Sequence, residues 1–298
     1  MSVNADWIAV DWGTSSLRAW AMDAEGHDLA TASSNQGMGQ LAPSEFEAAL
    51  CTLVEPWLSV GPTNVIACGM LGARQGWIEA PYDVAPCKPQ SRLTKAPTTD
   101  PRLNVQIIAG VSQARPADVM RGEETQILGA VSGKSGDYTF CLPGTHSKWV
   151  SVVDGKINGF TTFMTGEVFD VMCQHSILGK LMTGQGRIET DALHWFDDGV
   201  DKAKVGISLL SGFFGVRARA LFAEIPEAYT KDYLSGLLIG TEIRDAYKDN
   251  ATEVTMIGSG PLIALYGRVI KAFGGQAQLA NENLSAAGIY ELAKEIKK

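Results

Sequence analysis

Short apolar runs separated by turn residues open the chain and predict strands. Ile8 to Trp12 is apolar apart from Asp11 and ends at a glycine, Ser16 to Asp23 alternates roughly between apolar and polar positions, and His27 to Ser33 follows a tight turn. These three segments predict an antiparallel meander. A helix is expected from Pro43 to about Leu58, and later segments read as strands at 64–68 and 106–109 and a helix at 123–131. Such alternation favours a mixed sheet covered by helices.

The opening pattern recurs in the second half of the chain. Strands are expected at 138–142, 148–153 and 157–163, and Gly144-Thr-His-Ser147 repeats the Gly13-Thr-Ser-Ser16 that follows the first strand. In both copies a turn-forming Asp lies at the same distance from the glycine. An internal repeat of this kind predicts two domains of like design. The Gly/Ser/Lys segment 133–136 marks the expected boundary, which gives domains 1–134 and 135–298.

The remainder is expected to be mainly helical. Long helices are predicted at 202–222, 231–247 and 284–297, with short strands at 253–257 and 276–280. The Pro-, Thr- and Lys-rich stretch 81–101 reads as a long loop.

Composition narrows the class of protein. The chain has 298 residues, 45% of them hydrophobic, and a formal net charge of -8, which fits a two-domain globular protein and argues against broad nucleic-acid binding. The five cysteines are scattered and form no Cys-x-x-Cys pair, so neither a disulfide framework nor a zinc cluster is expected. With no signal-like or membrane-spanning run, a cytoplasmic protein without a membrane partner is expected.

The two Gly-Thr-x-Ser segments are candidates for binding phosphate. Consecutive backbone N–H groups in such turns form anion-binding nests, to which Thr14 and Ser15 would add hydroxyls in the first segment. Asp11, at the end of the first strand, could hold a hydrated magnesium ion, which needs few protein carboxylates. Lys148 could add positive charge and His146 could act as a base. Ordinary polar hairpin turns, a solvated lysine and a turn histidine are the plainer alternatives.

A third glycine-rich turn, Gly258-Ser259-Gly260, joins a strand to a helix. Its small residues would let a flat ligand approach the backbone, and Pro261 suits a first helical turn. The G-x-G-x-x-G motif of dinucleotide-binding folds is not completed here, and the first glycine of a P-loop is replaced by Leu128. No G-x-S-x-G nucleophile motif of a hydrolase occurs.

Together these three segments resemble the acetate kinase, sugar kinase, Hsp70 and actin superfamily. Closer still, Asp-Trp-Gly-Thr-Ser-Ser-Leu-Arg-Ala-Trp at 11–20, Arg-Gly-Glu-Glu-Thr-Gln at 121–126 and Leu-Pro-Gly-Thr-His-Ser-Lys-Trp at 142–149 look like the 2-dehydro-3-deoxygalactonokinase family. The resemblance covers nearly the whole chain. It implies an α/β protein of two ribonuclease H-like (actin-like ATPase) domains, each a mixed β-sheet with helices, flanking an interdomain cleft.

The same resemblance implies ATP and Mg²⁺ as cofactors and transfer of the γ-phosphoryl group to the C6 hydroxyl of 2-dehydro-3-deoxy-D-galactonate, in galactonate breakdown. The first phosphate loop and most substrate contacts would lie in the N-terminal domain, and the second loop and the adenosine site in the C-terminal domain. A homodimer is left open. The residues implied for ATP are Gly13, Thr14, Ser15, Ser16, Gly144, Thr145, His146, Ser147, Lys148, Gly258, Ser259 and Gly260, with Asp11 for the metal and catalysis.

One departure concerns the general base. Sugar kinases of the superfamily usually carry an Asp at the start of the helix before the second phosphate loop, where this chain has Glu123 and Glu124. Glu123 is the first candidate for the base and Glu124 the second, with upstream Asp118 as a fallback. Both glutamates could instead simply favour the helix N-terminus.

Three residues are candidates for binding the sugar acid. Arg74 could hold the carboxylate, Gln75 could contact a hydroxyl, and Gly39 could approach the sugar chain. Three alternatives stay open for the whole chain: a kinase for another sugar acid or ketose, a non-catalytic sugar sensor on the same fold, and an ATPase that needs no sugar.

Overall fold

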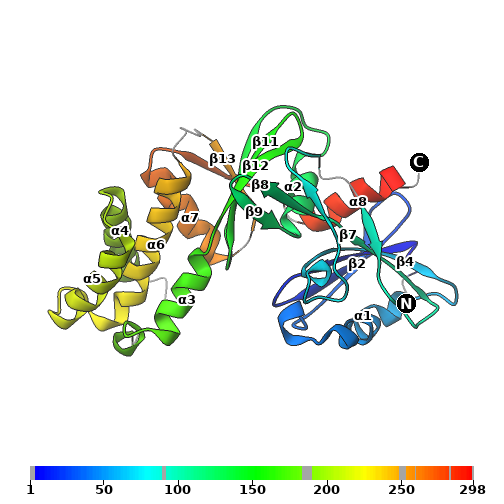
Figure 1. Ribbon diagram of the computed structural model, residues 1–298, viewed down its shortest axis with the longest axis horizontal. Helices are drawn as coiled ribbons and strands as arrows, with labels where there is room; N and C mark the ends of the chain where they lie inside the picture. The colour runs from blue at the N-terminus through cyan, green and yellow to red at the C-terminus, as the bar shows by residue number, and fades with distance from the viewer. Residues whose placement is uncertain are drawn as a thin grey trace. The chain divides into compact units, whose positions relative to one another are not determined.

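The computed structural model describes residues 4–88, 92–182, 190–247, 253–258, 260–281 and 283–296. The chain divides into two compact units (Figure 1). The first comprises Met1–Asp137, Ser151–Phe160 and Asn281–Lys298, and the second comprises Tyr138–Val150 and Thr161–Ala280. Two segments that follow parts of the second unit in the sequence, 151–160 and 281–298, thus belong to the first unit. The expected domain boundary at 134/135 stays a prediction.

A six-stranded mixed sheet forms the centre of the first unit, in the order β3-β2-β1-β4-β7-β6. The first three strands form the antiparallel meander expected from the sequence, and β4 and β7 extend it in parallel with β1. β6 pairs antiparallel with β7 at the edge. The strands are β1 (Trp7–Trp12), β2 (Leu17–Met22), β3 (Asp28–Ser34), β4 (Thr63–Gly69), β6 (Leu93–Lys95) and β7 (Leu103–Ile108).

Both faces of this sheet are buried. The side chains of Ile8, Val10 and Trp12 pack in one core with α1 (Phe46–Val54). The alternate residues of β1 pack in a second core with α8 (Leu284–Ile296), and α2 (Glu123–Val131) lies beside α8 (Figure 1). Because every residue of β1 is buried, the strand reads as an apolar run rather than as an alternating pattern.

A second, small sheet completes the first unit. It contains β5 (Tyr82–Val84), β8 (Gly110–Ala114) and β9 (Ala117–Met120), in the order β5-β8-β9. The expectation of an irregular loop over 81–101 is wrong in part, because β5 and β6 both fall within it. These strands are three residues long, too short for a periodic signal in the sequence.

The sheet of the second unit repeats the design of the first. Its order is β12-β11-β10-β13-β14, so that a strand pair joined by a tight turn again leads into parallel strands. Asp154 and Gly155 form that turn, with φ of 49° and 71°, and this tip belongs to the first unit. The strands are β10 (Tyr138–Leu142), β11 (Ser147–Val153), β12 (Lys156–Phe163), β13 (Glu253–Met256) and β14 (Gln276–Leu279).

Five α-helices are described in the second unit. They are α3 (Thr165–His175), α4 (Thr190–Lys204), α5 (Leu209–Leu221), α6 (Thr230–Ala246) and α7 (Pro261–Ala272). The single helix expected over 202–222 is wrong: the chain turns at Gly206, whose φ is 80°, between α4 and α5. α4 and α6 pack closely, since a Cβ on Gly236 would lie 1.9 Å from the carbonyl oxygen of Phe196. The expected α/β class with two mixed sheets is confirmed.

All five cysteines are free thiols. Within the described residues, no helix combines the length and the apolar character needed to cross a membrane.

Candidate functional site

In the first unit, the carboxyl ends of parallel strands meet the beginning of a helix. Trp12 and Gly69 are partners at the ends of β1 and β4. Gly69 has a φ of 101°, and a Cβ on it would lie 2.5 Å from the carbonyl oxygen of Trp12. Gly122, which precedes α2, has a φ of 109°, and its Cβ would lie 3.2 Å from the Cα of Gly69. Since open α/β sheets bind ligands at the carboxyl ends of their strands, this edge is the candidate site of the unit.

The first candidate phosphate loop leaves from this edge. The Gly13 N–H donates to the Ser16 carbonyl at 2.8 Å, which closes the loop, and Thr14, Ser15 and Ser16 are exposed. The Gly39 N–H donates to the Thr14 carbonyl at 2.9 Å. Gly39, which is predicted to contact the sugar, thus holds the first candidate phosphate loop through its backbone.

Asp11 is held by two partners that the sequence analysis did not identify. Its Oδ2 accepts from Arg18 Nη2 at 2.6 Å and from Ser285 Oγ at 2.6 Å. Ser285 in turn accepts from Gln126 Nε2 at 3.3 Å. Asp11 is buried, and both contacts fall on one oxygen, so Oδ1 is not engaged by them. One carboxylate held in this way fits a magnesium ion that keeps most of its waters.

Glu123 and Glu124 lie in the first turn of α2 but in different surroundings. The Glu124 carboxylate is buried and accepts from the Gly122 N–H at 2.8 and 2.9 Å and from Thr125 Oγ1 at 3.1 Å. Burial and the neighbouring Glu123 raise the pKa of Glu124 to about 8. Glu123 is partly exposed, and its Oε2 accepts from the Arg121 N–H at 2.9 Å. Glu124 therefore fixes the helix start, while Glu123 is the one of the two that a substrate could reach.

Arg74 and Gln75 lie on the loop that follows β4. Both side chains are exposed, and Arg74 forms no ion pair with any described residue. The loop folds back on itself, with the Trp77 N–H donating to the Leu71 carbonyl at 2.7 Å. Arg74 is therefore available to an anionic ligand at the surface of the first unit.

In the second unit, two more candidate segments leave from one sheet edge. Cys141 in β10 and Met256 in β13 are parallel partners, and the Ile257 N–H donates to the Cys141 carbonyl at 2.9 Å. The loop that begins at Pro143 and the turn at Gly258 consequently lie next to each other. This proximity is what a shared nucleotide site requires.

The start of α3 supports the second candidate phosphate loop. The Glu167 N–H donates to the Thr145 carbonyl at 3.0 Å, and the Glu167 carboxylate forms an ion pair with His146. Lys148 is 5% exposed, and its Nζ donates to the His146 carbonyl at 3.3 Å. His146 is thus engaged with a carboxylate of its own unit, which favours a loop-positioning role over that of a base.

Ser147 differs from its counterpart Ser16, because its hydroxyl points into the core. Its Oγ lies 2.8 Å from the hydroxyl of Tyr266 in α7, and that hydroxyl donates to Glu242 Oε2 at 2.6 Å. Trp149 Nε1 also donates to Glu242, at 2.8 Å. Burial raises the pKa of Glu242. This network fixes the second loop to α6 and α7, and leaves the backbone of the loop, rather than the Ser147 hydroxyl, for phosphate.

The third glycine-rich turn precedes α7. Gly258 and Gly260 are exposed and have φ of 151° and 75°. A Cβ on Gly260 would meet no atom within 4 Å, so the surface there is open to a ligand. Ser259, also predicted to bind the nucleotide, lies outside the described residues.

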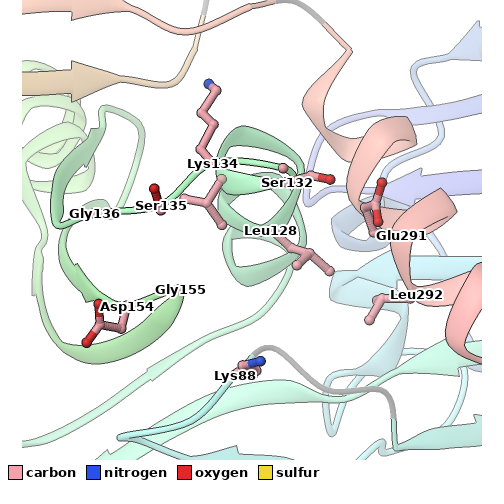
Figure 2. A pocket seen from close by; sticks show the side chains of 12 residues that line it. Lys88, Leu128, Ser132, Lys134, Ser135, Gly136, Asp154, Gly155, Glu291 and Leu292 are labelled. Atoms are coloured by element: carbon pink, nitrogen blue, oxygen red, sulfur yellow. The ribbon is translucent and has the colours of Figure 1, made fainter.

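A pocket of about 380 Å³ lies at the other end of α2 (Figure 2). Leu128 and Leu292 contribute apolar side chains to it, and Lys88, Asp154 and Glu291 charged ones. It contains none of the residues predicted for catalysis or binding. Among the described residues there is also no cluster of three or more His, Cys, Asp and Glu side chains that could hold a metal ion.

Comparison with known proteins identifies the family of this chain. Residues 11–292 match the model of the 2-keto-3-deoxy-galactonokinase family. The chain is 37% identical over 283 residues to a protein of Rhizobium meliloti (strain 1021) described as a 2-dehydro-3-deoxygalactonokinase, with 92% of each chain covered. It is 33% identical to the 2-dehydro-3-deoxygalactonokinase of Escherichia coli (strain K12), with 99% of each chain covered.

One solved structure gives the same assignment. A crystal structure from Sinorhizobium meliloti, described as a 2-dehydro-3-deoxygalactonokinase, has a TM-score of 0.88 and 36% identity, with 97% of this chain and 96% of that chain covered. Component A of the (R)-2-hydroxyglutaryl-CoA dehydratase of Acidaminococcus fermentans, at 12% identity and a TM-score of 0.50, shares the fold alone. The fold expected for the superfamily is confirmed, and the chain belongs to the 2-keto-3-deoxy-galactonokinase family.

Proposed function

We propose that this protein is an ATP-dependent kinase that phosphorylates the C6 hydroxyl of 2-dehydro-3-deoxy-D-galactonate, a step in galactonate breakdown. The observation that carries the proposal is family membership over nearly the whole chain, together with a partly exposed carboxylate, Glu123, at the carboxyl edge of the first sheet. A sugar sensor would have no need of a carboxylate at that place.

The first unit would bind the sugar acid and activate its hydroxyl. Glu123 would accept the hydroxyl proton as the C6 oxygen attacks phosphorus, because it is the accessible carboxylate of α2. Arg74 would attract the carboxylate of the acid, Gln75 would bind a hydroxyl, and Gly39 would let the sugar chain approach the backbone. Asp11 would hold, through water, a magnesium ion whose charge offsets that of the phosphates.

The nucleotide would bind at two loops of the second unit. Gly144, Thr145 and the following residues would direct backbone N–H groups to the phosphates, and Gly258 to Gly260 would approach the adenosine. Backbone loops 13–16 and 144–147 would stabilise the charge that develops in the transition state. Catalysis by such a protein consists mainly of positioning and electrostatic stabilisation, since phosphoryl transfer needs little covalent chemistry from side chains.

A coupled assay of ADP release tests this function. The panel contains 2-dehydro-3-deoxygalactonate, its C4 epimer, a ketose and a reaction without sugar, each with the wild type and with Glu123→Gln. The highest kcat/KM is expected for 2-dehydro-3-deoxygalactonate. Preference for another compound would assign a different kinase, ATP turnover without sugar would indicate an ATPase, and no turnover of any compound would favour a sensor.

A further inference from the structure

Arg121 is a buried guanidinium that the proposed mechanism does not use. It lies between β9 and α2 and is 7% exposed. Its Nη2 donates to the Ala80 carbonyl at 2.7 Å, and its guanidinium carbon lies 4.2 Å from the centre of the Tyr82 ring. A Cβ on Gly72 would lie 3.0 Å from Nη1, so a glycine there leaves room for the guanidinium.

The Nε and Nη1 donors of Arg121 have no acceptor among the residues that the structure describes. Nε and Nη1 are buried and make no hydrogen bond, and Arg121 forms no ion pair with any described residue. An arginine stays charged at every pH at which a protein is folded, and burying a charge is costly unless it is paired. One contact with a neutral carbonyl and one with an aromatic ring do not neutralise it. A bound carboxylate would supply both the opposite charge and the acceptors.

Arg121 lies in the part of the first unit that would bind the sugar acid. Its backbone N–H holds the Glu123 carboxylate, and its neighbour Gly122 touches Gly69 at the end of β4. Glu123 would act at the C6 end of the substrate, whereas the carboxylate lies at the other end of the molecule. That carboxylate presents two oxygens that accept hydrogen bonds from a guanidinium.

We propose that the Arg121 guanidinium binds the carboxylate of the sugar acid, and so makes the site select an acid over a neutral sugar. This inference rests on the proposed function. Arg74 on the exposed loop attracts the acid, and Arg121 is the residue that distinguishes it from a neutral sugar. Since Nε and Nη1 are buried in this structure, binding would require the side chain to turn from the Ala80 carbonyl toward the ligand.

The test compares 2-dehydro-3-deoxygalactonate with its C1 amide, which keeps every hydroxyl and loses the charge. For the wild type we expect a much lower KM for the acid. Hydrogen bonds to charged groups contribute about 1.5–3 kcal/mol, so Arg121→Gln should raise KM for the acid about 10- to 150-fold. KM for the amide should change by less than about threefold, which a merely structural role would not produce.

Two further variants make the result decisive. Arg121→Lys keeps the charge without the planar fork and should restore part of the affinity for the acid; it also carries the test if Arg121→Gln does not fold. Arg92→Gln is the matched control, because Arg92 is exposed, contacts Tyr82 through its carbonyl and is paired with Asp83. It should leave the KM of both compounds unchanged.

Equal KM of the acid and the amide for the wild type would overturn the inference while leaving the proposed function standing. An equal rise of KM for the acid and for the amide in both Arg121→Gln and Arg121→Lys would also overturn the inference, since Arg121 would then only support the loop. Absence of turnover of both compounds by the wild type would overturn the proposed function, and this inference with it.

Discussion

Ser285 donates a hydrogen bond to Asp11 at 2.6 Å across a separation of 274 residues. α8, near the end of the chain, thereby fixes the carboxylate at the end of β1, near its beginning. Close packing of α8 on α2 makes this contact possible, since a Cβ on Gly288 would lie 1.9 Å from the Thr125 carbonyl oxygen. The proposed metal-positioning residue thus depends on both helices.

The first prediction concerns this contact. Ser285→Ala removes a hydrogen bond to a charged group, which contributes about 1.5–3 kcal/mol, and should raise the Mg²⁺ concentration needed for half-maximal activity about 10- to 150-fold. Asp11→Asn should lose most turnover while ATP binding persists. Ser211→Ala, on the exposed surface of α5, is the control. Near-normal turnover of Asp11→Asn at saturating Mg²⁺ would contradict the assignment of Asp11.

The second prediction separates the two glutamates. Glu123→Gln should lower kcat by about 10²–10⁴-fold with little change in KM, because it removes the basic carboxylate at nearly constant volume. Glu124→Gln is the matched control at the adjacent position and should lower kcat far less, since Glu124 is buried against Gly122. Steady-state kinetics of both variants check this. A larger fall in kcat for Glu124→Gln would make Glu124 the general base in place of Glu123. An unchanged kcat in both variants would favour Asp118 as the base or direct transfer of the proton to the phosphoryl group.

Local sequence predicted much of the fold around the candidate site, because the sequence signals for strands, turns and the start of a helix are short. The meander, the repeat and the bounds of α2 all follow from turn residues and apolar runs within a few positions. The partners of Asp11 could not be predicted in this way. Ser285 is an ordinary polar residue near the start of a helix, and only the packing of α8 on α2 brings it to β1.

The two Gly-Thr-x-Ser segments share a sequence pattern but differ in the burial of their last residue. Ser16 and Ser147 close the same Gly-Thr-x-Ser pattern, yet Ser16 is exposed and Ser147 is fully buried. The difference arises because β11 begins at Ser147, whereas β2 begins one residue after Ser16. The Ser147 hydroxyl then forms a hydrogen bond with the hydroxyl of Tyr266 in α7, which in turn donates to Glu242 in α6. The burial of Arg121 Nε and Nη1 without a hydrogen-bond partner likewise depends on how residues 72–82 fold around the guanidinium, and no local pattern in the sequence indicates it.

The third prediction is a pH dependence of stability. The pKa of Glu124 is about 8 in the folded protein, above the ordinary value of 4.5. The unfolded chain therefore loses this proton first as pH rises, and the contribution of Glu124 to stability, complete below about pH 4.5, falls until about pH 8. The loss is on the order of a few kcal/mol. Denaturant unfolding between these pH values should show a falling free energy of unfolding in the wild type and a much smaller fall in Glu124→Gln. An equal dependence of this free energy on pH in the two proteins would be inconsistent with a buried, proton-binding Glu124.

The fourth prediction concerns the turn before α7. Gly260→Ala should raise KM for ATP several-fold more than KM for the sugar acid, because the side chain would occupy open surface proposed for the adenosine. The substitution also strains the backbone, since φ is 75°. Gly274→Ala is matched to it: Gly274 follows the other end of α7, has a φ of 86° and also faces open space. Equal changes in KM for ATP in both variants would show that strain, and not a nucleotide contact, is responsible.

The central claim is transfer of the γ-phosphoryl group of ATP to the C6 hydroxyl of the sugar acid, and the product reports on it directly. Wild-type protein is incubated with ATP, Mg²⁺ and 2-dehydro-3-deoxygalactonate, and proton-coupled phosphorus-31 NMR follows the new phosphate ester. A monoester signal split into a triplet by the two C6 protons, growing in step with ADP, is the predicted result. A doublet from a secondary hydroxyl, or inorganic phosphate as the only product, would contradict the account.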